Sequence, residues 1–312
     1  MRSAYSSPPD VRKWRIWAIR GAAALFVLGL LAYGGVSYRV ADGLTKPTRQ
    51  PLDPPAASVA ATYEDVSFKS TDGLLLKGWW FPVPSADRAV VIVHGRGANR
   101  IKSSFDPQKI AQFLLASRYS VLLFDLRGHG ESDGLRYSLG EYEPRDIVAA
   151  IDFAQRKAGI DRKRVAIIGE SMGGGSAIMT VKADPTIGPV ITDSAFADGN
   201  TVVSEVAPNY TGLPGWFTPG IVLMARVFFD LDLSVIKPAE VVRDHPERAW
   251  LFIQCENDTT VYRHHGVELK AASANPGTEL WLVPDCEHVK AFDTHTVEWE
   301  QHVLAFLTRE IR

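Results

Sequence analysis

A serine flanked by glycines stands where the chain changes from a strand-like run to a helix-like run. The motif is Gly169-Glu170-Ser171-Met172-Gly173. Gly169 and Gly173 leave room for a sharp turn, and a serine at such a turn projects its hydroxyl away from the backbone. The pattern predicts a nucleophile elbow with Ser171 as the nucleophile, and the alternative is an inert serine in a glycine-rich turn.

A serine hydroxyl needs a base to take its proton, and the base needs a carboxylate to orient it. His288 is the best candidate for the base among the eight histidines, because it follows the last strand-like run in a loop before a helix. Asp258 follows the preceding strand-like run, so the three residues occur in the order Ser, Asp, His that is typical of elbow-bearing hydrolases. The alternatives that stay open for the acid are Glu256, Asp193 and Asp198.

Acyl transfer also needs two N–H donors for the oxyanion that forms on the substrate. Met172 directly follows the serine and is expected to supply one donor. The second is expected from His94-Gly95-Arg96-Gly97, where glycines let the backbone approach the substrate, and we assign it to the N–H of Arg96. The Arg96 side chain then either points to solvent or binds an anionic group of the substrate.

Apolar strand-like runs alternate with amphipathic helix-like runs over most of the chain. The expected strands are 63–69, 74–81, 89–93, 121–124, 165–168, 189–192, 250–254 and 279–283, and the main helices are 101–117, 141–158 and 174–181. Buried strands that alternate with helices predict an α/β fold, with a mostly parallel sheet covered on both faces. Ligands bind beyond the carboxyl ends of such strands, which is where the candidate residues fall.

Residues 197–243 interrupt this alternation after the sixth expected strand. They contain prolines and glycines around an apolar helix-like run, 221–231, and several aromatic residues that would be costly to expose. We expect a lid over the strand ends, and packing on the edge of the domain is the alternative.

Two other polar segments follow strands. Asp125 and Arg127 begin one, and we expect them to form a buried, hydrogen-bonded turn that supports the oxyanion loop rather than to touch substrate. Ser194 lacks the flanking glycines of an elbow, so with Asp193 it is expected to line the pocket wall.

The N-terminal region carries a candidate membrane anchor. The uncharged run 21–38 would rise about 27 Å as a helix, enough to cross a bilayer, and Trp14 and Trp17 precede it where interfacial aromatics occur. More basic residues precede the run than follow it, which predicts a cytoplasmic N-terminus and an extracytoplasmic catalytic domain. A signal peptide cleaved at residues 32–34 and a buried soluble helix are the alternatives.

The sequence thus predicts an anchor in 1–40, a proline-rich tether in 41–61 and a catalytic α/β domain in 62–312. A net charge of −2 without a basic stripe after residue 50 argues against a nucleic-acid partner. The chain has no Cys-x-x-Cys, His-Glu-x-x-His or Walker motif, so no metal and no cofactor are expected.

Together these motifs resemble the α/β-hydrolase superfamily, most closely its serine-aminopeptidase-like, Bem46-like branch, over residues 63–312. The resemblance is carried by His94-Gly95, the segment 125–132, the segment 169–174, Asp193-Ser194 and the late Asp and His. It implies an α/β-hydrolase fold with a lid insert after strand 6, and a cofactor-free serine hydrolase of esterase, lipase-like or thioesterase type.

The fold implied by this resemblance brings the loops of the acid and the base to neighbouring strands. Cys255 and Cys286 stand in these loops, where such enzymes usually have small residues, and the expected topology places them in an oxidising compartment. A disulfide between them is therefore a hypothesis, with two free thiols as the alternative. Glu287 is a second departure, and its charge would alter the pKa of the neighbouring base.

The predicted function is hydrolysis of a carboxylic ester or thioester with an apolar acyl or aryl group, by a membrane-tethered enzyme. An aminopeptidase of the same fold is one alternative, and it would need an acidic residue to bind the substrate amine. The candidates for that role are Glu170, Glu205 and Glu256. A non-catalytic binding protein is another alternative, and haloperoxidase-like or lyase chemistry on the same triad is a third.

Overall fold

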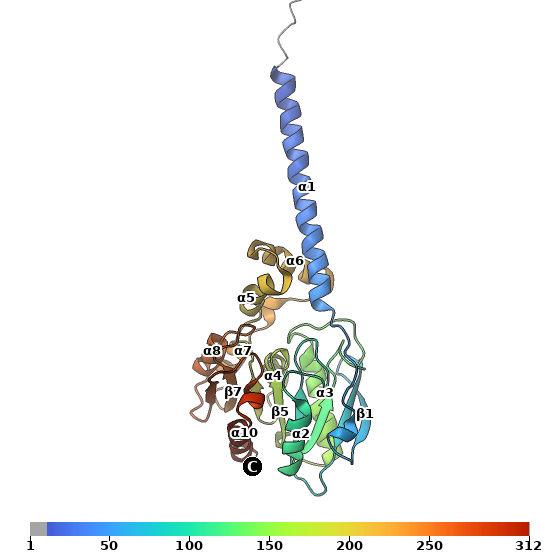
Figure 1. Cartoon of the computed structure of the whole chain (residues 1–312), viewed down its shortest axis with the longest axis vertical. Helices are drawn as coiled ribbons and strands as arrows, with labels where there is room; N and C mark the ends of the chain where they lie inside the picture. The colour runs from blue at the N-terminus through green and yellow to red at the C-terminus, as the bar shows by residue number, and fades with distance from the viewer. Residues whose placement is uncertain (1–10, 312) are drawn as a thin grey trace, which may run out of the picture.

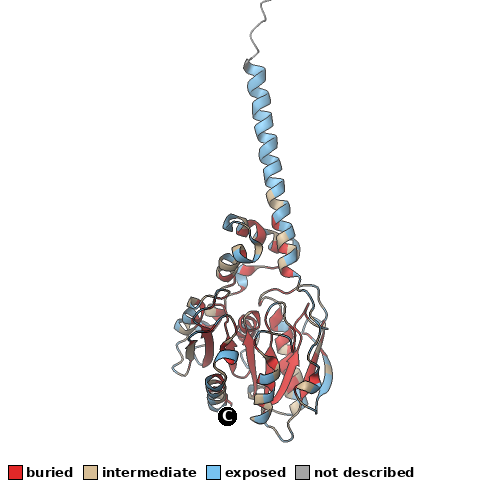
Figure 2. Cartoon of the chain, viewed as in Figure 1, coloured by how far each residue is buried: buried red, intermediate tan, exposed pale blue. Residues whose placement is uncertain are grey.

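The computed structural model describes residues 11–311, which form one long helix and an α/β domain. Helix α1 (Val11–Thr45) projects from the domain for most of its length (Figure 1). Residues 12–32 are exposed, whereas several residues from Tyr33 onward are partly or fully buried against the domain (Figure 2). Helix α1 is long and apolar enough to cross a membrane, as an anchor or as a signal sequence.

An eight-stranded sheet forms the centre of the domain, in the order β1-β2-β4-β3-β5-β6-β7-β8. The strands are β1 (Glu64–Lys69), β2 (Leu75–Phe81), β3 (Ala89–Val93), β4 (Ser120–Phe124), β5 (Val165–Glu170), β6 (Val190–Asp193), β7 (Trp250–Cys255) and β8 (Glu279–Val283). Strand β2 is antiparallel to β1 and β4, and all other pairs are parallel. The predicted mostly parallel sheet is confirmed.

Helices cover both faces of this sheet, as predicted. Helices α2 (Pro107–Ala116), α9 (Ala291–Thr294) and α10 (Thr296–Glu310) pack on one face, and α3 (Glu143–Ala158), α4 (Met172–Ala183) and α8 (His264–Ala272) on the other. In β3, the side chains of Val90 and Ile92 pack on the face covered by α2, α9 and α10. Those of Val91 and Val93 pack on the face covered by α3, α4 and α8. Side chains alternate between faces along a strand, so strands covered on both sides are apolar throughout.

The insert after β6 folds into helices, of which α5 and α6 lie above the sheet beside the lower end of α1 (Figure 1). It comprises α5 (Gly199–Thr211), η3 (Gly215–Phe217), α6 (Thr218–Phe229), η4 (Leu233–Val235) and α7 (Pro238–Asp244). Helices α5 and α6 contribute side chains to the cavity above Ser171. The predicted lid insert is therefore confirmed, and we call residues 197–243 the lid.

The segment predicted as a stiff, proline-rich tether, residues 41–61, is partly helical and contacts the domain. Helix α1 continues to Thr45, so residues 41–45 are helical, and it ends there because Pro47 disfavours helical backbone at the residue before it. A short helix, η1 (Ala56–Ser58), then follows, and Ala56 packs in one apolar core. Arg49 also holds the segment to the domain by donating to backbone carbonyls of the 129–134 loop.

Helix α2 begins six residues later than the expected helix 101–117. The Asp106 side chain accepts the N–H of Lys109, and Pro107 occupies the first helical position. Both are typical starts of a helix, because an N-cap carboxylate satisfies a free N–H and proline there loses no hydrogen bond. Residues 101–106 consequently remain a loop beside the candidate site.

Candidate active site

Ser171 stands on the turn between β5 and α4 in strained backbone. Its φ of 48° and ψ of −118° are outside the regions that non-glycine residues ordinarily occupy. A Cβ on Gly173 would strike the backbone of Val93, and one on Gly169 would strike the backbone of Gly173. The glycines are therefore required by close backbone packing around this turn.

Ser171, His288 and Asp258 form a continuous hydrogen-bonded chain. The Oγ of Ser171 lies 3.0 Å from Nε2 of His288, and Nδ1 of His288 lies 2.7 Å from Oδ2 of Asp258. Asp258 is buried, and its Oδ1 accepts the N–H groups of Thr260 and Val261, both at 2.8 Å. With the Nδ1–H of His288 donated to this carboxylate, Nε2 is left to accept the serine proton.

The alternative acids are placed differently. Glu256 is exposed, and Asp198 caps the N-terminus of α5 and pairs with Lys237. Asp193 is buried, but its Oδ1 accepts the Ser194 hydroxyl at 3.0 Å. The structure thus brings only Asp258 of these four carboxylates into hydrogen-bonding contact with His288.

The loop after β3 is held by hydrogen bonds on both sides of Arg96. The N–H of Gly95 donates to Oε1 of Glu170 at 2.7 Å, and the N–H of Gly97 donates to Nε2 of His129 at 3.1 Å. Within residues 11–311, no acceptor is found for the N–H of Arg96. Met172 is the first residue of α4, where helix N–H groups have no partner inside the helix.

His94 anchors this loop to the neighbouring strand end. Its Nε2 accepts the N–H of Leu126 at 3.0 Å, and its Nδ1 bonds the carbonyl of Gly95 at 2.8 Å. Burial, together with the adjacent His129, lowers the pKa of His94 to about 3. The ring is therefore neutral, which is the form that can donate at Nδ1 and accept at Nε2.

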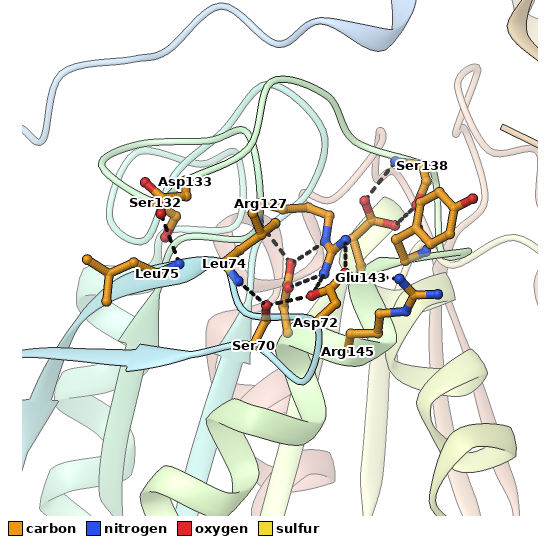
Figure 3. Close-up of polar contacts among 12 residues, drawn as sticks. Ser70, Asp72, Leu74, Leu75, Arg127, Ser132, Asp133, Ser138, Glu143 and Arg145 are labelled. Carbon is orange, nitrogen blue, oxygen red and sulfur yellow. Dashed lines mark hydrogen bonds and ion pairs between the residues drawn. The ribbon is translucent and has the colours of Figure 1, made fainter. Parts of the chain in front are cut away.

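The segment after β4 is a buried polar support, as the sequence predicts for Asp125 and Arg127. Asp125 accepts the backbone N–H and two guanidinium N–H groups of Arg100. Arg127 binds Asp146 of α3 and Asp72 of the β1–β2 turn. Figure 3 shows the Arg127 side chain between these elements. Because every charge here is paired, the segment supports the loop structurally.

Two buried carboxyls near Ser171 and His288 were not recognised from the sequence as a pair. Glu170 and Asp193 are register partners on β5 and β6, and one oxygen of each has no hydrogen-bond partner among the described residues. Burial raises the pKa of Glu170, and burial with the nearby charge of Glu170 raises the pKa of Asp193 to about 7. The sequence indicates only that Glu170 and Asp193 each stand at the end of an apolar strand.

The raised pKa of Asp193 predicts a pH-dependent cost to stability. Between the unfolded pKa near 3.8 and the folded value of about 7, the folded state holds a proton that the unfolded state has released. The free energy of unfolding therefore falls as pH rises through this window, by up to about 1.4 kcal/mol per pH unit from this group. We expect Asp193→Asn to gain stability relative to the parent between pH 5 and pH 8.

Urea unfolding of the full chain in detergent at both pH values measures this difference. Asp65→Asn is the matched control, because Asp65 is an exposed aspartate on β1. An equal difference between the Asp193 variant and the parent at pH 5 and pH 8 would show that Asp193 does not titrate in this range.

A cavity of about 290 Å³ opens above Ser171. Its walls come from α1, from the lid and from the loops after β3, β4, β5, β7 and β8. Representative lining residues are Ala41, Leu44, Val203, Ile221, Ser171 and His288. The guanidinium of Arg96 lies 4.3 Å from the ring centre of Tyr210 at the cavity wall, so its side chain is turned toward the lid.

Cys255 and Cys286 are joined in a disulfide, as hypothesised. The bond ties the end of β7 to the loop that carries His288, and the N–H of Asn257 donates to the carbonyl of Cys286 at 3.0 Å. These links connect the loops of Asp258 and His288 independently of the hydrogen bond between the two side chains.

Comparison with known proteins agrees with this fold. The profile of the alpha/beta hydrolase family matches residues 90–298, which is more than half of the chain. The chain belongs to the alpha/beta hydrolase family. Membership of this family supports hydrolase activity for the domain that carries Ser171.

Similar proteins occur in bacteria and archaea. The uncharacterized protein YfhR of Escherichia coli strain K12 is 26% identical over 250 residues, covering 78% of this chain and 80% of YfhR. The uncharacterized protein Rv2307c of Mycobacterium tuberculosis is 32% identical over 165 residues, covering 52% and 54%. The solved Pyrococcus furiosus esterase Pf2001 is 25% identical with a TM-score of 0.70, covering 86% of this alpha/beta hydrolase and 100% of the esterase.

Proposed function

We propose that this alpha/beta hydrolase cleaves carboxylic esters or thioesters through an acyl-serine intermediate. The observation that carries the proposal is the hydrogen-bonded chain from Ser171 through His288 to Asp258, with the serine on a strained turn at the base of a cavity. A non-catalytic binding protein has no need for this arrangement.

In the proposed mechanism, Ser171 attacks the acyl carbon while Nε2 of His288 takes its proton, and Asp258 stabilises the imidazolium. The N–H groups of Met172 and Arg96 stabilise the oxyanion. His288 then protonates the leaving group, which departs and leaves the acyl-serine. A water molecule, deprotonated by the same histidine, releases the acid and restores Ser171.

The surroundings of the cavity favour an ester over a peptide substrate. An aminopeptidase needs a carboxylate that faces the substrate amine. Glu170 lines the cavity, but its Oε1 accepts the N–H of Gly95 and burial raises its pKa, which disfavours the charged carboxylate that an amine would need. Glu205 is bonded to His264 and His265, and Glu256 is not among the cavity-lining residues. The apolar side chains from α1 and the lid fit an acyl chain better than a charged amine.

We further propose that α1 is retained as a single-pass anchor with the catalytic domain on the extracytoplasmic side. The supporting observations are the exposed apolar helix and the excess of basic residues before it. The disulfide is consistent with an oxidising compartment. The segment after the anchor, residues 46–61, contacts the catalytic domain through Ala56 and Arg49.

Hydrolysis by the full chain in detergent tests the function directly. The panel consists of p-nitrophenyl esters of increasing chain length, an acyl thioester and amino-acid p-nitroanilides. We expect turnover of the esters with little on the anilides. Faster turnover of the anilides would favour the aminopeptidase, and no turnover together with no fluorophosphonate labelling would favour the binding protein.

Glu170 provides a test of the oxyanion assignment. We expect Glu170→Ala to lower kcat/KM for p-nitrophenyl butyrate about 100-fold, because the freed Gly95 N–H lets the loop with the Arg96 donor move. Glu170→Gln keeps an oxygen at the acceptor position and is expected to stay within a few-fold of the parent. Equal losses in both variants would mean that the charge of Glu170, rather than its hydrogen bond, is what matters.

A further inference from the structure

The C-terminal part of α1 is packed on the lid. Tyr33 stacks on Trp216 and Phe217, with ring centres 5.6 and 5.1 Å apart. Its hydroxyl donates to the carbonyl of Trp216 and accepts the N–H of Gly220, both at 3.0 Å. A Cβ on Gly220 would strike Tyr33 and Ser37, so the glycine allows α1 and α6 to meet.

Helix α6 also contacts α1 at its other end. The ring of Tyr38 lies 5.2 Å from that of Phe228 and 5.3 Å from that of Phe229. The start of α6 is thus level with Tyr33 and its end is level with Tyr38, so α6 follows α1 as α1 approaches the domain (Figure 1).

These contacts set the depth of the lid relative to any membrane that α1 crosses. The uncharged run 21–38 contains 18 residues and spans about 27 Å, against a hydrocarbon core of about 30 Å. Tyr33 lies about 9 Å inside the end of this run at Arg39. Without the six residues level with the lid, the run would span only about 18 Å. Moving the span toward the N-terminus instead would place Arg20 and Arg15 in hydrocarbon.

The outer surface of the lid is apolar, as a surface at the depth of the hydrocarbon core must be. Trp216, Leu223, Val227 and Phe228 are each more than half exposed. Leu223 and Val227 are one helical turn apart and share a face. Charges gather at the end of α6 that lies level with Tyr38, where Arg226 pairs with Asp232 at 3.1 Å and Asp230 follows the helix.

The opposite face of α6 lines the catalytic cavity. Ile221, Val222 and Ala225 contribute to its wall, together with Ala41 and Leu44 of α1. A single helix therefore separates the exposed apolar surface from the cavity above Ser171.

We propose that the outer surface of the lid, formed by Trp216, Leu223, Val227 and Phe228, rests in the phospholipid bilayer that α1 crosses, and that the cavity takes its acyl chain from this bilayer. The substrate class is then a membrane-resident lipid ester whose acyl chain enters the apolar cavity, and a monoacylglycerol is the probe of this class used below. The docking part rests on α1 as an anchor, and the substrate part also rests on the proposed ester hydrolysis.

The docking surface is tested without reference to activity. A nitroxide is attached to Val227→Cys or to Val297→Cys, and each full chain is placed in phospholipid nanodiscs. The chain without an added cysteine measures how much nitroxide attaches to the native Cys255 and Cys286. Both valines are 62% exposed, and Val297 lies on α10 of the domain. We expect the nitroxide at 227 to be more accessible to oxygen than to a water-soluble nickel complex, and the reverse at 297.

Equal accessibility ratios at the two positions would overturn the proposal, because position 227 would then face water. Low accessibility of position 227 to both reagents would also overturn it, because a second copy or another protein would then cover the lid.

Loading from the bilayer is tested with Val227→Glu and its control Val297→Glu in the same nanodiscs. We expect Val227→Glu to slow hydrolysis of bilayer-held monooleoylglycerol about tenfold or more, since a carboxylate is disfavoured in lipid, and to leave p-nitrophenyl butyrate within about twofold. Equal rates for Val227→Glu and parent on the monoacylglycerol would overturn bilayer loading. If the parent cleaves neither ester, the proposed function fails, and the nitroxide result still decides the docking surface.

Discussion

Replacement of Ser171 by alanine is expected to abolish labelling by a fluorophosphonate probe and to lower kcat on p-nitrophenyl esters by about 10⁴-fold to 10⁶-fold. The Oγ that lies 3.0 Å from His288 is the proposed site of acylation, and alanine leaves no atom to form the intermediate. The loss of kcat should be larger than the loss caused by any single substitution at a residue other than Ser171, His288 and Asp258. Rates and probe labelling are measured on the full chain in detergent.

His288→Ala is expected to match the serine variant, because residues that act as one unit do not lose activity additively. Ser120→Ala is the matched control, since Ser120 is a buried serine at the start of β4 whose hydroxyl accepts the N–H of Val83 and which does not line the cavity. Labelling that survives in Ser171→Ala but disappears in Ser120→Ala would contradict the assignment of the nucleophile.

Asp258→Asn is expected to lower kcat about 10⁴-fold without loss of folding. The N–H groups of Thr260 and Val261 bind Oδ1, so they will hold the amide oxygen of asparagine at that position. The amide NH₂ must then face Nδ1 of His288 in place of Oδ2. The neutral imidazole must then carry its proton on Nε2. A protonated Nε2 can no longer accept the proton of Ser171.

Kinetics on p-nitrophenyl butyrate, with the unfolding midpoint as a check on folding, measure the effect of this substitution. Asp198→Asn is the control, because asparagine replaces aspartate well as an N-cap and Asp198 does not contact the triad. Activity of Asp258→Asn within about tenfold of the parent would show that another carboxylate orients the histidine.

The strands, the elbow and the order of candidate residues could be predicted from the sequence because their signals are local. An uninterrupted apolar run of five or six residues marks a strand buried on both faces, and all eight strands lie close to their expected positions. The glycines around Ser171 are also a local signal, because they stand next to the serine in the sequence and indicate a sharp turn there. Boundaries that depend on caps, such as the start of α2 at Pro107, were less accurate.

The choice of acid was narrowed by sequence and decided by three-dimensional contacts. Asp258, Glu256 and Asp193 all follow strands, and chain order alone favours Asp258. Only the loop conformation after β7, held by the N–H groups of Thr260 and Val261, turns that carboxylate toward His288. The raised pKa of Asp193 likewise depends on its burial beside Glu170, which no local pattern reports.

The sequence by itself determined that this chain has an apolar N-terminal helix and an α/β domain with a serine elbow. Only the tertiary structure decided that the end of this helix packs on the lid and lines the cavity. Tyr33 and Gly220 are 187 positions apart, and their hydrogen bond depends on how two separately formed helices pack. Local periodicity specifies which face of a helix is apolar, but not which distant helix covers it.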